Sequence, residues 1–380
     1  MTRPILFLLP SLSLFASSTS SAPLPTNTPN LAPRIPSHSP CDCYLVSGSD
    51  PGYFTNYKFW DFRNVSLPHS PGDKPNAQDP SNAWEAQTTL LSESTFKNEW
   101  HAQSWSRDTM DDSTVSMANS HRNAFFAPHP QIPDTTQLVL RTTQLSNYSS
   151  TAEIESLQAN FYRCSLRVRM RLMSRDAVSG VPGNTKTDDI NKVPKGACAG
   201  IFTYRSASCE SDLEFLTSDP PNTIHYANQP DYDAVNSLFI PNASQVVTTL
   251  PSPWSSWVTH RMDWLANATV WYADNKRQAS VTYGVPDRPS ILALNLWSDG
   301  GSWTGDMAVN QSVYMGIEWI EVAYNTSTVD ISPILTTRRR RHRPFKRENR
   351  NSEWERQIPG NQAVVGSCAR PCYLDKMQHY

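Results

Sequence analysis

Apolar residues along this chain occur in short runs, with no long stripe at helical spacing. Between about residues 41 and 325, runs of four to eleven residues are apolar or alternate apolar with polar, and Pro, Asn, Asp and Ser separate them. Such short runs, punctuated by turn residues, are typical of the strands of a sandwich or barrel. The chain is therefore predicted to be all-β, with strands at 137–141, 163–173, 199–204, 212–216, 223–226, 268–273, 280–283, 291–297 and 315–324.

Two segments of different character precede this body. Residues 1–22 combine Arg3, a short apolar stretch and small residues around Ser18 and Ala22, which is the pattern of a secretory signal peptide. Residues 23–40 are rich in Pro, Ser, Thr and Asn and have little to bury, so we predict a linker. No apolar stretch reaches the roughly 20 residues that a bilayer requires, so we expect no membrane span.

A basic segment follows the body. Residues 338–380 hold 11 of the 33 basic residues but 4 of the 35 acidic ones, so the net charge of −2 averages two unlike parts. We predict a disordered basic tail over 328–380; a dibasic processing site at Lys346–Arg347 or an anchor to acidic wall polymers are alternatives. The body, 41–327, is acidic and gives no reason to expect nucleic acid as a partner. We expect a monomer.

Composition and cysteines narrow the class of protein further. The 380 residues include 30 Pro and 12 Trp but only 14 Gly, and 18% are charged, which disfavours a helical bundle or a glycine-rich nucleotide-binding fold. Seven cysteines behind a signal peptide indicate disulfides with at least one thiol left over, and six Asn-x-Ser/Thr sites fit a glycosylated, secreted product. Cys41 and Cys43 lack a second pair at zinc spacing, so we favour a disulfide role over a metal site.

The sharpest candidate chemistry lies in ESDLEFL, residues 210–216. In an extended strand Glu210, Asp212 and Glu214 lie on one face and the apolar residues on the other. A solvated strand face would give the same alternation. Three like charges in a row repel, however, and such clusters tend to persist where paired carboxyls do chemistry.

Retaining glycoside hydrolysis is the chemistry that fits these acids. One carboxylate attacks the anomeric carbon, and a second carboxyl about 5–5.5 Å away protonates the leaving oxygen. Positions four apart on a strand have Cα atoms roughly 13 Å apart, so strand curvature and converging Glu side chains must close the gap. Asp212, between them, would hydrogen-bond the nucleophile and hold up the pKa of the acid by its charge.

A second segment, ILALNLW at 291–297, suggests a carbohydrate partner. Its leucines share one face, whereas Asn295 and Trp297 share the other. Indole faces stack on sugar rings and amides bond to hydroxyls, although any one tryptophan could equally belong to the core. The predicted substrate-binding residues are Asn295, Trp297, Trp303, Trp264 and Tyr226.

These segments together resemble glycoside hydrolase family 16, the concanavalin A-like lectin/glucanase group. The resemblance rests on residues 210–216, 260–273, 289–303 and 317–324, and with 41–62 and 206–229 it looks like the fungal secreted branch. The family implies a β-jelly-roll sandwich of two antiparallel sheets with a sugar cleft on the concave face. It also implies that Glu210 is the nucleophile, Asp212 the assisting carboxylate and Glu214 the general acid/base, with Asn295 and Trp297 lining the cleft.

The sequence thus predicts a retaining glycosidase, secreted or associated with the cell wall, that acts on a β-linked glucan. A transglycosylase with the same covalent intermediate is one alternative, and a non-catalytic, lectin-like protein on the same fold is another. A structural wall protein anchored by the basic tail is a third. The expected partner is a polysaccharide, and the chemistry requires neither a cofactor nor a metal.

Overall fold

The computed structural model describes residues 41–48, 52–67, 88–109, 112–178, 192–233, 235–327 and 368–377. The predicted signal peptide, the 23–40 linker and most of the predicted basic tail lie outside these ranges. Within them, no helix has both the length and the apolar character needed to cross a membrane.

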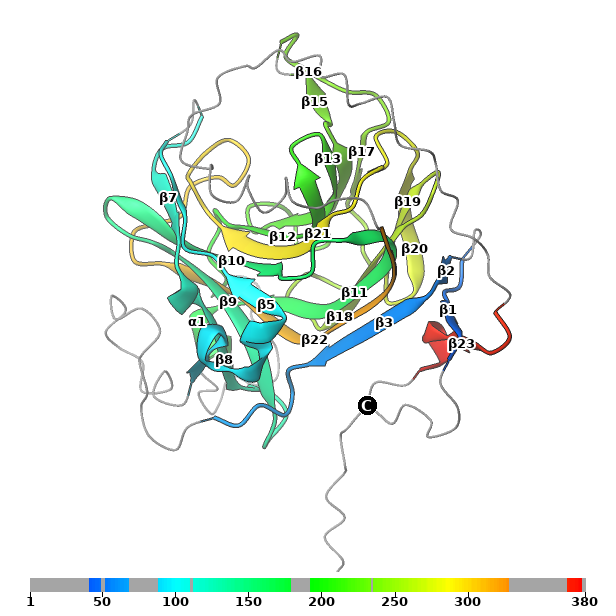
Figure 1. The fold of residues 1–380 in the computed structure, drawn as a ribbon. Coiled ribbons are helices and arrows are strands. Elements are labelled where there is room, and N and C mark those ends of the chain that lie inside the picture. Colours follow the sequence, from blue (N-terminus) through cyan, green and yellow to red (C-terminus); the bar gives the residue numbers. More distant parts are fainter. Residues whose placement is uncertain are drawn as a thin grey trace, which may run out of the picture.

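The body consists of two stacked, mostly antiparallel β-sheets (Figure 1). The inner sheet has the order β5 (Trp100–Ala102), β10 (Tyr148–Ser156), β21 (Ile291–Trp297), β12 (Cys198–Ser206), β13 (Cys209–Leu216), β14 (Ile224–Gln229) and β17 (Ser244–Val247). The central part of the outer sheet has the order β20 (Lys276–Val281), β19 (Thr269–Ala273), β18 (Val258–Trp264), β11 (Phe161–Met173) and β22 (Ser312–Thr326).

The outer sheet continues beyond β22 along two different partners. One half of β22 pairs with β3 (Asn56–Asp61) and the other with β9 (Thr136–Gln144), which in turn pairs with β8 (Ala124–Pro128) and, through it, β4 (Thr89–Leu90). Strand β10 joins the two sheets, because its first half pairs with β9 and β7 (Ser116–Asn119) and its second half with β21 and β5. Strand β6 (Ser106–Arg107) lies at the edge beside β7.

Short elements connect these strands. They are the 3₁₀ turns η2 (Leu91–Glu93), η3 (Thr95–Asn98) and η4 (His121–Asn123), the helix α1 (Arg175–Val178) and the hairpin of β15 (Tyr232–Asp233) with β16 (Leu238–Phe239). Every predicted strand coincides with an observed one, although β20 begins and ends earlier than the predicted 280–283. The predicted all-β jelly-roll sandwich is therefore confirmed.

Alternation along each strand explains the core between the sheets. In β11, Leu166, Val168 and Met170 are buried in the main apolar cluster, whereas Arg167 and Arg169 point to the outer surface, where both form ion pairs. Side chains of successive strand residues point to opposite faces, so one apolar set per strand is enough to hold the two sheets together.

The end of the chain corrects one prediction. Strand β23 (Pro371–Tyr373) pairs in parallel with β1 (Cys43–Leu45), which also pairs with β2 (Tyr53–Phe54). Disulfides Cys41–Cys372 and Cys43–Cys368 join the same segments across sequence separations of 331 and 325 residues. A disordered tail over all of 328–380 is therefore wrong for 368–377, which is part of the folded body. The predicted disulfides with thiols left over are confirmed, since Cys164, Cys198 and Cys209 are free and buried.

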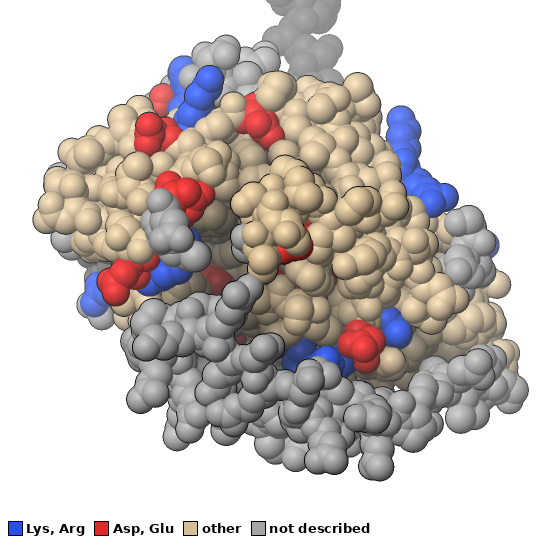
Figure 2. Space-filling view, turned by 90° about the horizontal axis from the view of Figure 1, so that it is seen from above, with Lys and Arg blue, Asp and Glu red and all other residues tan. Residues whose placement is uncertain are grey.

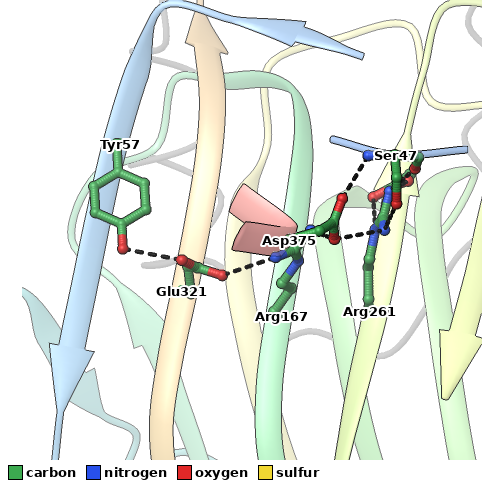
Figure 3. A network of polar contacts seen from close by, with 7 residues as sticks. Ser47, Tyr57, Arg167, Arg261, Glu321 and Asp375 are labelled. Atoms are coloured by element: carbon green, nitrogen blue, oxygen red, sulfur yellow. Dashed lines mark hydrogen bonds and ion pairs between the residues drawn. The ribbon is translucent and has the colours of Figure 1, made fainter. Parts of the chain in front are cut away.

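Asp375 fastens this C-terminal segment to the outer face (Figure 3). It lies in the turn η7 (Leu374–Lys376), and its carboxylate accepts hydrogen bonds from Arg167 Nη2 (2.6 Å), Arg261 Nη1 (3.3 Å) and the backbone N–H of Ser47 (2.6 Å). Leu374 beside it is buried against the N-terminal segment. Residues from both ends of the chain thus share one polar cluster.

The cluster extends across four neighbouring strands. Glu321 of β22 accepts hydrogen bonds from Tyr57 Oη of β3 (2.9 Å) and from Arg167 Nη1 of β11 (3.3 Å) (Figure 3). Arg261 of β18 makes two bonds to Asp263, at 2.8 and 2.5 Å. Each arginine therefore meets at least two acceptors, which is the condition under which buried charges are tolerated.

Candidate active site

Strand β13 places the three predicted acids on the face of the inner sheet that is turned away from the core. Leu213 and Phe215 belong to the apolar cluster between the sheets, so Glu210, Asp212 and Glu214 point to the opposite side. Asp212 is only 6% exposed, whereas Glu210 and Glu214 are half-buried. The predicted alternation is thus present.

The register of the inner sheet brings Asn295 into line with these acids. Glu214 lies opposite Gly200 of β12 on one side and opposite His225 of β14 on the other, and Gly200 lies opposite Asn295 of β21. A Cβ on Gly200 would come 2.6 Å from Asn295 Oδ1. Glycine at this position therefore leaves room for the Asn295 carboxamide beside the acidic strand.

Asn295 also offers an open acceptor. Its Oδ1 is buried and finds no hydrogen-bond partner among the residues that the structure describes. Buried polar atoms of a folded protein nearly always have a partner, and the exceptions call for an explanation. A ligand hydroxyl that donates to this oxygen would supply one.

Burial controls the protonation of the Glu214 carboxyl. Removal from water raises its pKa to about 7, although hydrogen bonds from the Cys198 thiol (3.4 Å, to Oε1) and from the Trp303 indole act in the opposite direction. Burial also raises the pKa of Asp212, the charge of Glu214 raises it further, and a bond from Gln229 Nε2 (3.1 Å) lowers it. Near pH 7, the site can therefore hold a carboxylic acid that is able to donate a proton.

Trp303 reaches the site from a loop that Asp299 organises. One Asp299 oxygen accepts from the backbone N–H of Gly301 (3.0 Å) and from Thr304 Oγ1 (3.1 Å), and the other pairs with Arg107 (3.1 Å). Asp299 itself is 7% exposed. These bonds fix the loop on both sides of Trp303.

Three aromatic or imidazole rings line the same end of the site. The Trp303 ring lies 4.9 Å from the His225 ring, edge to face, and His225 Nε2 lies 2.7 Å from the Asp219 carboxylate. Trp297 lies opposite Cys198 in the register, with the Arg107 guanidinium 5.7 Å from its ring centre. The structure thus places Trp297 and Trp303 at the same end of the site as Glu214, and their role in substrate binding stays a prediction.

Two predicted substrate-binding residues lie elsewhere. Trp264 is fully buried in the core, where its Nε1 donates to the carbonyl of Pro286 (2.7 Å). Tyr226 is 1% exposed, lies opposite Leu213 and packs against Trp271 with ring centres 5.2 Å apart. Both point between the sheets, away from the acids, so their prediction as substrate contacts is wrong. For Tyr226 the reason is strand parity, because its neighbours in β14 occupy the open face.

Sequence reasoning missed Cys198, Gln229 and His225. All three have the strand parity of the acidic face, and each contacts either an acid of the site or Trp303. Parity alone would have suggested them once the pairing of β12, β13 and β14 was known. No motif in the sequence marks that pairing.

The surface above the inner sheet is mostly uncharged. Figure 2 shows this side, with acidic side chains visible in a hollow near the middle of the face. A recessed acidic centre within an uncharged surface suits a neutral ligand with many hydroxyls better than an anion.

Comparison of the sequence with curated proteins finds β-glucanases that are similar to part of this chain. The β-glucanase of Bacillus licheniformis is 24% identical over 134 residues, or 33% of this chain and 51% of that protein, and the β-glucanase of Paenibacillus polymyxa is 24% identical over 139 residues, or 34% and 54%. About a third of this chain is thus similar to β-glucanases. It spans about half the length of the curated relatives it matches. No family model matches.

Solved structures are similar to this chain at lower identity. The Bacillus licheniformis β-glucanase structure is 17% identical with a TM-score of 0.45, covering 63% of this chain and 97% of that one. A β-1,3-1,4-glucanase (lichenase) from a mouse hindgut metagenome is 15% identical with a TM-score of 0.45, covering 71% and 100%.

Proposed function

We propose that this protein is a secreted, retaining glycoside hydrolase of family 16 that cleaves a β-linked glucan. The observation that carries the proposal is the acidic face of β13, where Glu210 and Glu214 share one side and burial raises the pKa of Glu214 to about 7. A nucleophile needs an ionised carboxyl and an acid needs a protonated one, so two carboxyls in unlike surroundings suit the two roles.

The proposed reaction has two steps. In the first, Glu210 attacks the anomeric carbon while the proton of Glu214 passes to the leaving glycosidic oxygen, which gives a covalent glycosyl-enzyme and a shortened glucan. In the second, ionised Glu214 takes a proton from water, the water oxygen attacks the anomeric carbon, and Glu210 leaves as a carboxylate. Asp212, held by Gln229, assists from between the two.

The substrate contacts proposed here follow from the described face. Trp303 is 37% exposed and offers a ring for sugar stacking, and Trp297 lies on the same face. The unpartnered Asn295 Oδ1 would accept a sugar hydroxyl.

Secretion is part of the proposal. Two disulfides and the signal-like first 22 residues support an oxidising, extracellular location. Five of the six glycosylation sites are exposed, namely Asn64, Asn147, Asn242, Asn267 and Asn310. Asn325 is the exception, because its carboxamide bonds to Thr55 and Tyr53. A cell-wall substrate and membership of the fungal branch are inferences from the sequence resemblance.

Product analysis on a panel of β-1,3, mixed-linkage and β-1,6 glucans and chitin oligomers tests the proposal. We expect shortened products whose new reducing ends first appear in the β configuration by NMR, and no products from Glu210→Gln. Products that first appear in the α configuration would contradict a retaining mechanism.

The same panel separates the alternatives. A transglycosylase would give elongated products when an acceptor oligosaccharide is added, because the sugar hydroxyl competes with water in the second step. A lectin-like protein would bind on a glycan array without giving products from any substrate. The presence of all three acids on one face favours an enzyme over the lectin.

A further inference from the structure

The free thiol of Cys198 lies against the carboxyl proposed as the acid. Cys198 begins β12 with its side chain fully buried, and its Sγ donates a hydrogen bond to Glu214 Oε1 at 3.4 Å. In the register it lies opposite Trp297 on one side and Leu216 on the other. The backbone of two paired strands therefore holds the thiol in place.

The thiol remains protonated while it makes this contact. Burial raises the pKa of Cys198 well above its ordinary value, and the charge of Glu214 raises it further. The Trp303 indole hydrogen-bonds to both groups and lowers the pKa of each. Cys198 is thus an S–H donor, and the Glu214 carboxyl lies beside both a thiol and an indole.

We propose that Cys198 is a positioning residue for Glu214, with its thiol fixing the orientation of the carboxyl group without binding it strongly. The proposal rests on the proposed role of Glu214 as general acid/base. A thiol is a weak donor, so it orients the carboxylate while stabilising the ionised form less than a hydroxyl would. A carboxyl oriented by a thiol therefore keeps its proton up to a higher pH than one oriented by a hydroxyl, as an acid catalyst must.

Other charged groups lie near Glu214, and replacement of Cys198 removes none of them. Glu210 and Asp212 lie along the same strand, His225 with its partner Asp219 lies across β14, and Asp231 follows β14 and raises the pKa of Glu214 by its charge. On the other side, Glu153 of β10 lies opposite Asn295 in the same row. A change in Glu214 titration on replacement of Cys198 therefore reports the thiol.

The test compares Cys198→Ala and Cys198→Ser in the full chain. The pH profile of kcat/KM is measured, and Glu214 is titrated without substrate by infrared difference spectroscopy against Glu214→Gln. Loss of the donor in Cys198→Ala should raise the pKa of Glu214 by roughly half a unit and move the basic limb of the profile upward. The stronger donor in Cys198→Ser should move both downward and preserve kcat better than alanine does.

Cys164→Ala is the matched control. Cys164 is also a free, fully buried thiol, but it lies in the core on β11. We expect a comparable loss of stability with an unchanged pH profile. If Cys198→Ala leaves the Glu214 titration and the profile unchanged, or if serine and alanine shift them equally, the proposal is wrong. The infrared titration needs no substrate, so this outcome is distinct from finding no glucan that the enzyme cleaves.

Discussion

Carboxylates are buried on both faces of this sandwich, and their pKa values move in opposite directions. On the outer face, Asp375 is partly exposed, with 21% of its side chain accessible; partial burial would raise its pKa, but Arg167, Ser47 and Arg261 outweigh it and the pKa is lowered. On the inner face, burial dominates at Asp212 and Glu214, and both pKa values rise. Loss of water contact raises the pKa on both faces, so the opposite outcomes come from the cations that only the outer-face carboxylate meets.

Glu318, on the outer face, also shows a pKa that neighbouring cations lower despite burial. Burial raises its pKa, yet contacts with His129 and Arg169 bring it below the ordinary value. An acid that meets an arginine contributes to the fold as a fixed anion. An acid that is buried among other acids keeps or gains a proton and can exchange it, which is the property a catalytic site needs.

The largest expected effect is loss of activity on the inner face. Glu210→Gln removes the proposed nucleophile and should lower kcat/KM by about 10³-fold or more, with the midpoint of thermal unfolding little changed. Glu99→Gln is the control, since Glu99 is a half-exposed acid paired with Lys58 at the surface. Full activity of Glu210→Gln would show that Glu210 is not the nucleophile. The contrast in pKa between the two faces would then say nothing about catalysis.

The next effect concerns stability on the outer face. Asp375→Asn leaves the buried Arg167 and Arg261 short of a negative partner, so the free energy of unfolding should fall by about 2–4 kcal/mol, measured by chemical denaturation. Asp42→Asn is matched to it, because Asp42 pairs with Arg370 of the same C-terminal segment but is exposed to solvent. Equal losses in the two variants would show that burial of the pair does not matter.

The pH dependence of stability should differ in sign between the faces. Glu214 has a pKa raised to about 7, so the folded state binds more protons than the unfolded state above about pH 4.5, and wild-type stability should fall between pH 4.5 and 7. Glu214→Gln should remove up to about 3 kcal/mol of this fall.

The lowered pKa of Asp375 acts oppositely, and its contribution to stability is lost as the solution becomes acidic. Denaturation across pH 2–8 checks both, because the Asp375 contribution is lost only below about pH 4; a flat difference between wild type and Glu214→Gln would contradict the assignment.

The smallest expected effect concerns the space beside Asn295. Gly200→Ala introduces a Cβ 2.6 Å from Asn295 Oδ1, which must move the carboxamide. We expect kcat/KM to fall roughly tenfold, because small displacements of a positioned group cost catalysis more than stability. Unchanged kinetics in this variant would show that the Asn295 carboxamide has no part in binding.

Much of this protein can be predicted from local sequence pattern. Alternation between apolar and polar residues located the strands, and the same period of two placed Glu210, Asp212 and Glu214 on one side of theirs. These features depend only on residues close together in the chain. The Asn295 and Trp297 pair was accessible for the same reason.

Tertiary structure decided what local pattern cannot contain. Trp264 and Trp303 are the same residue type, yet one is core and the other lines the site, because the choice depends on which strands pair and which face they cover. The contact of Cys198 with Glu214 depends on how β12 and β13 pair, and the disulfide between Cys41 and Cys372 joins residues 331 positions apart. Whether a buried acid gains or loses affinity for its proton likewise depends on neighbours that only folding brings together.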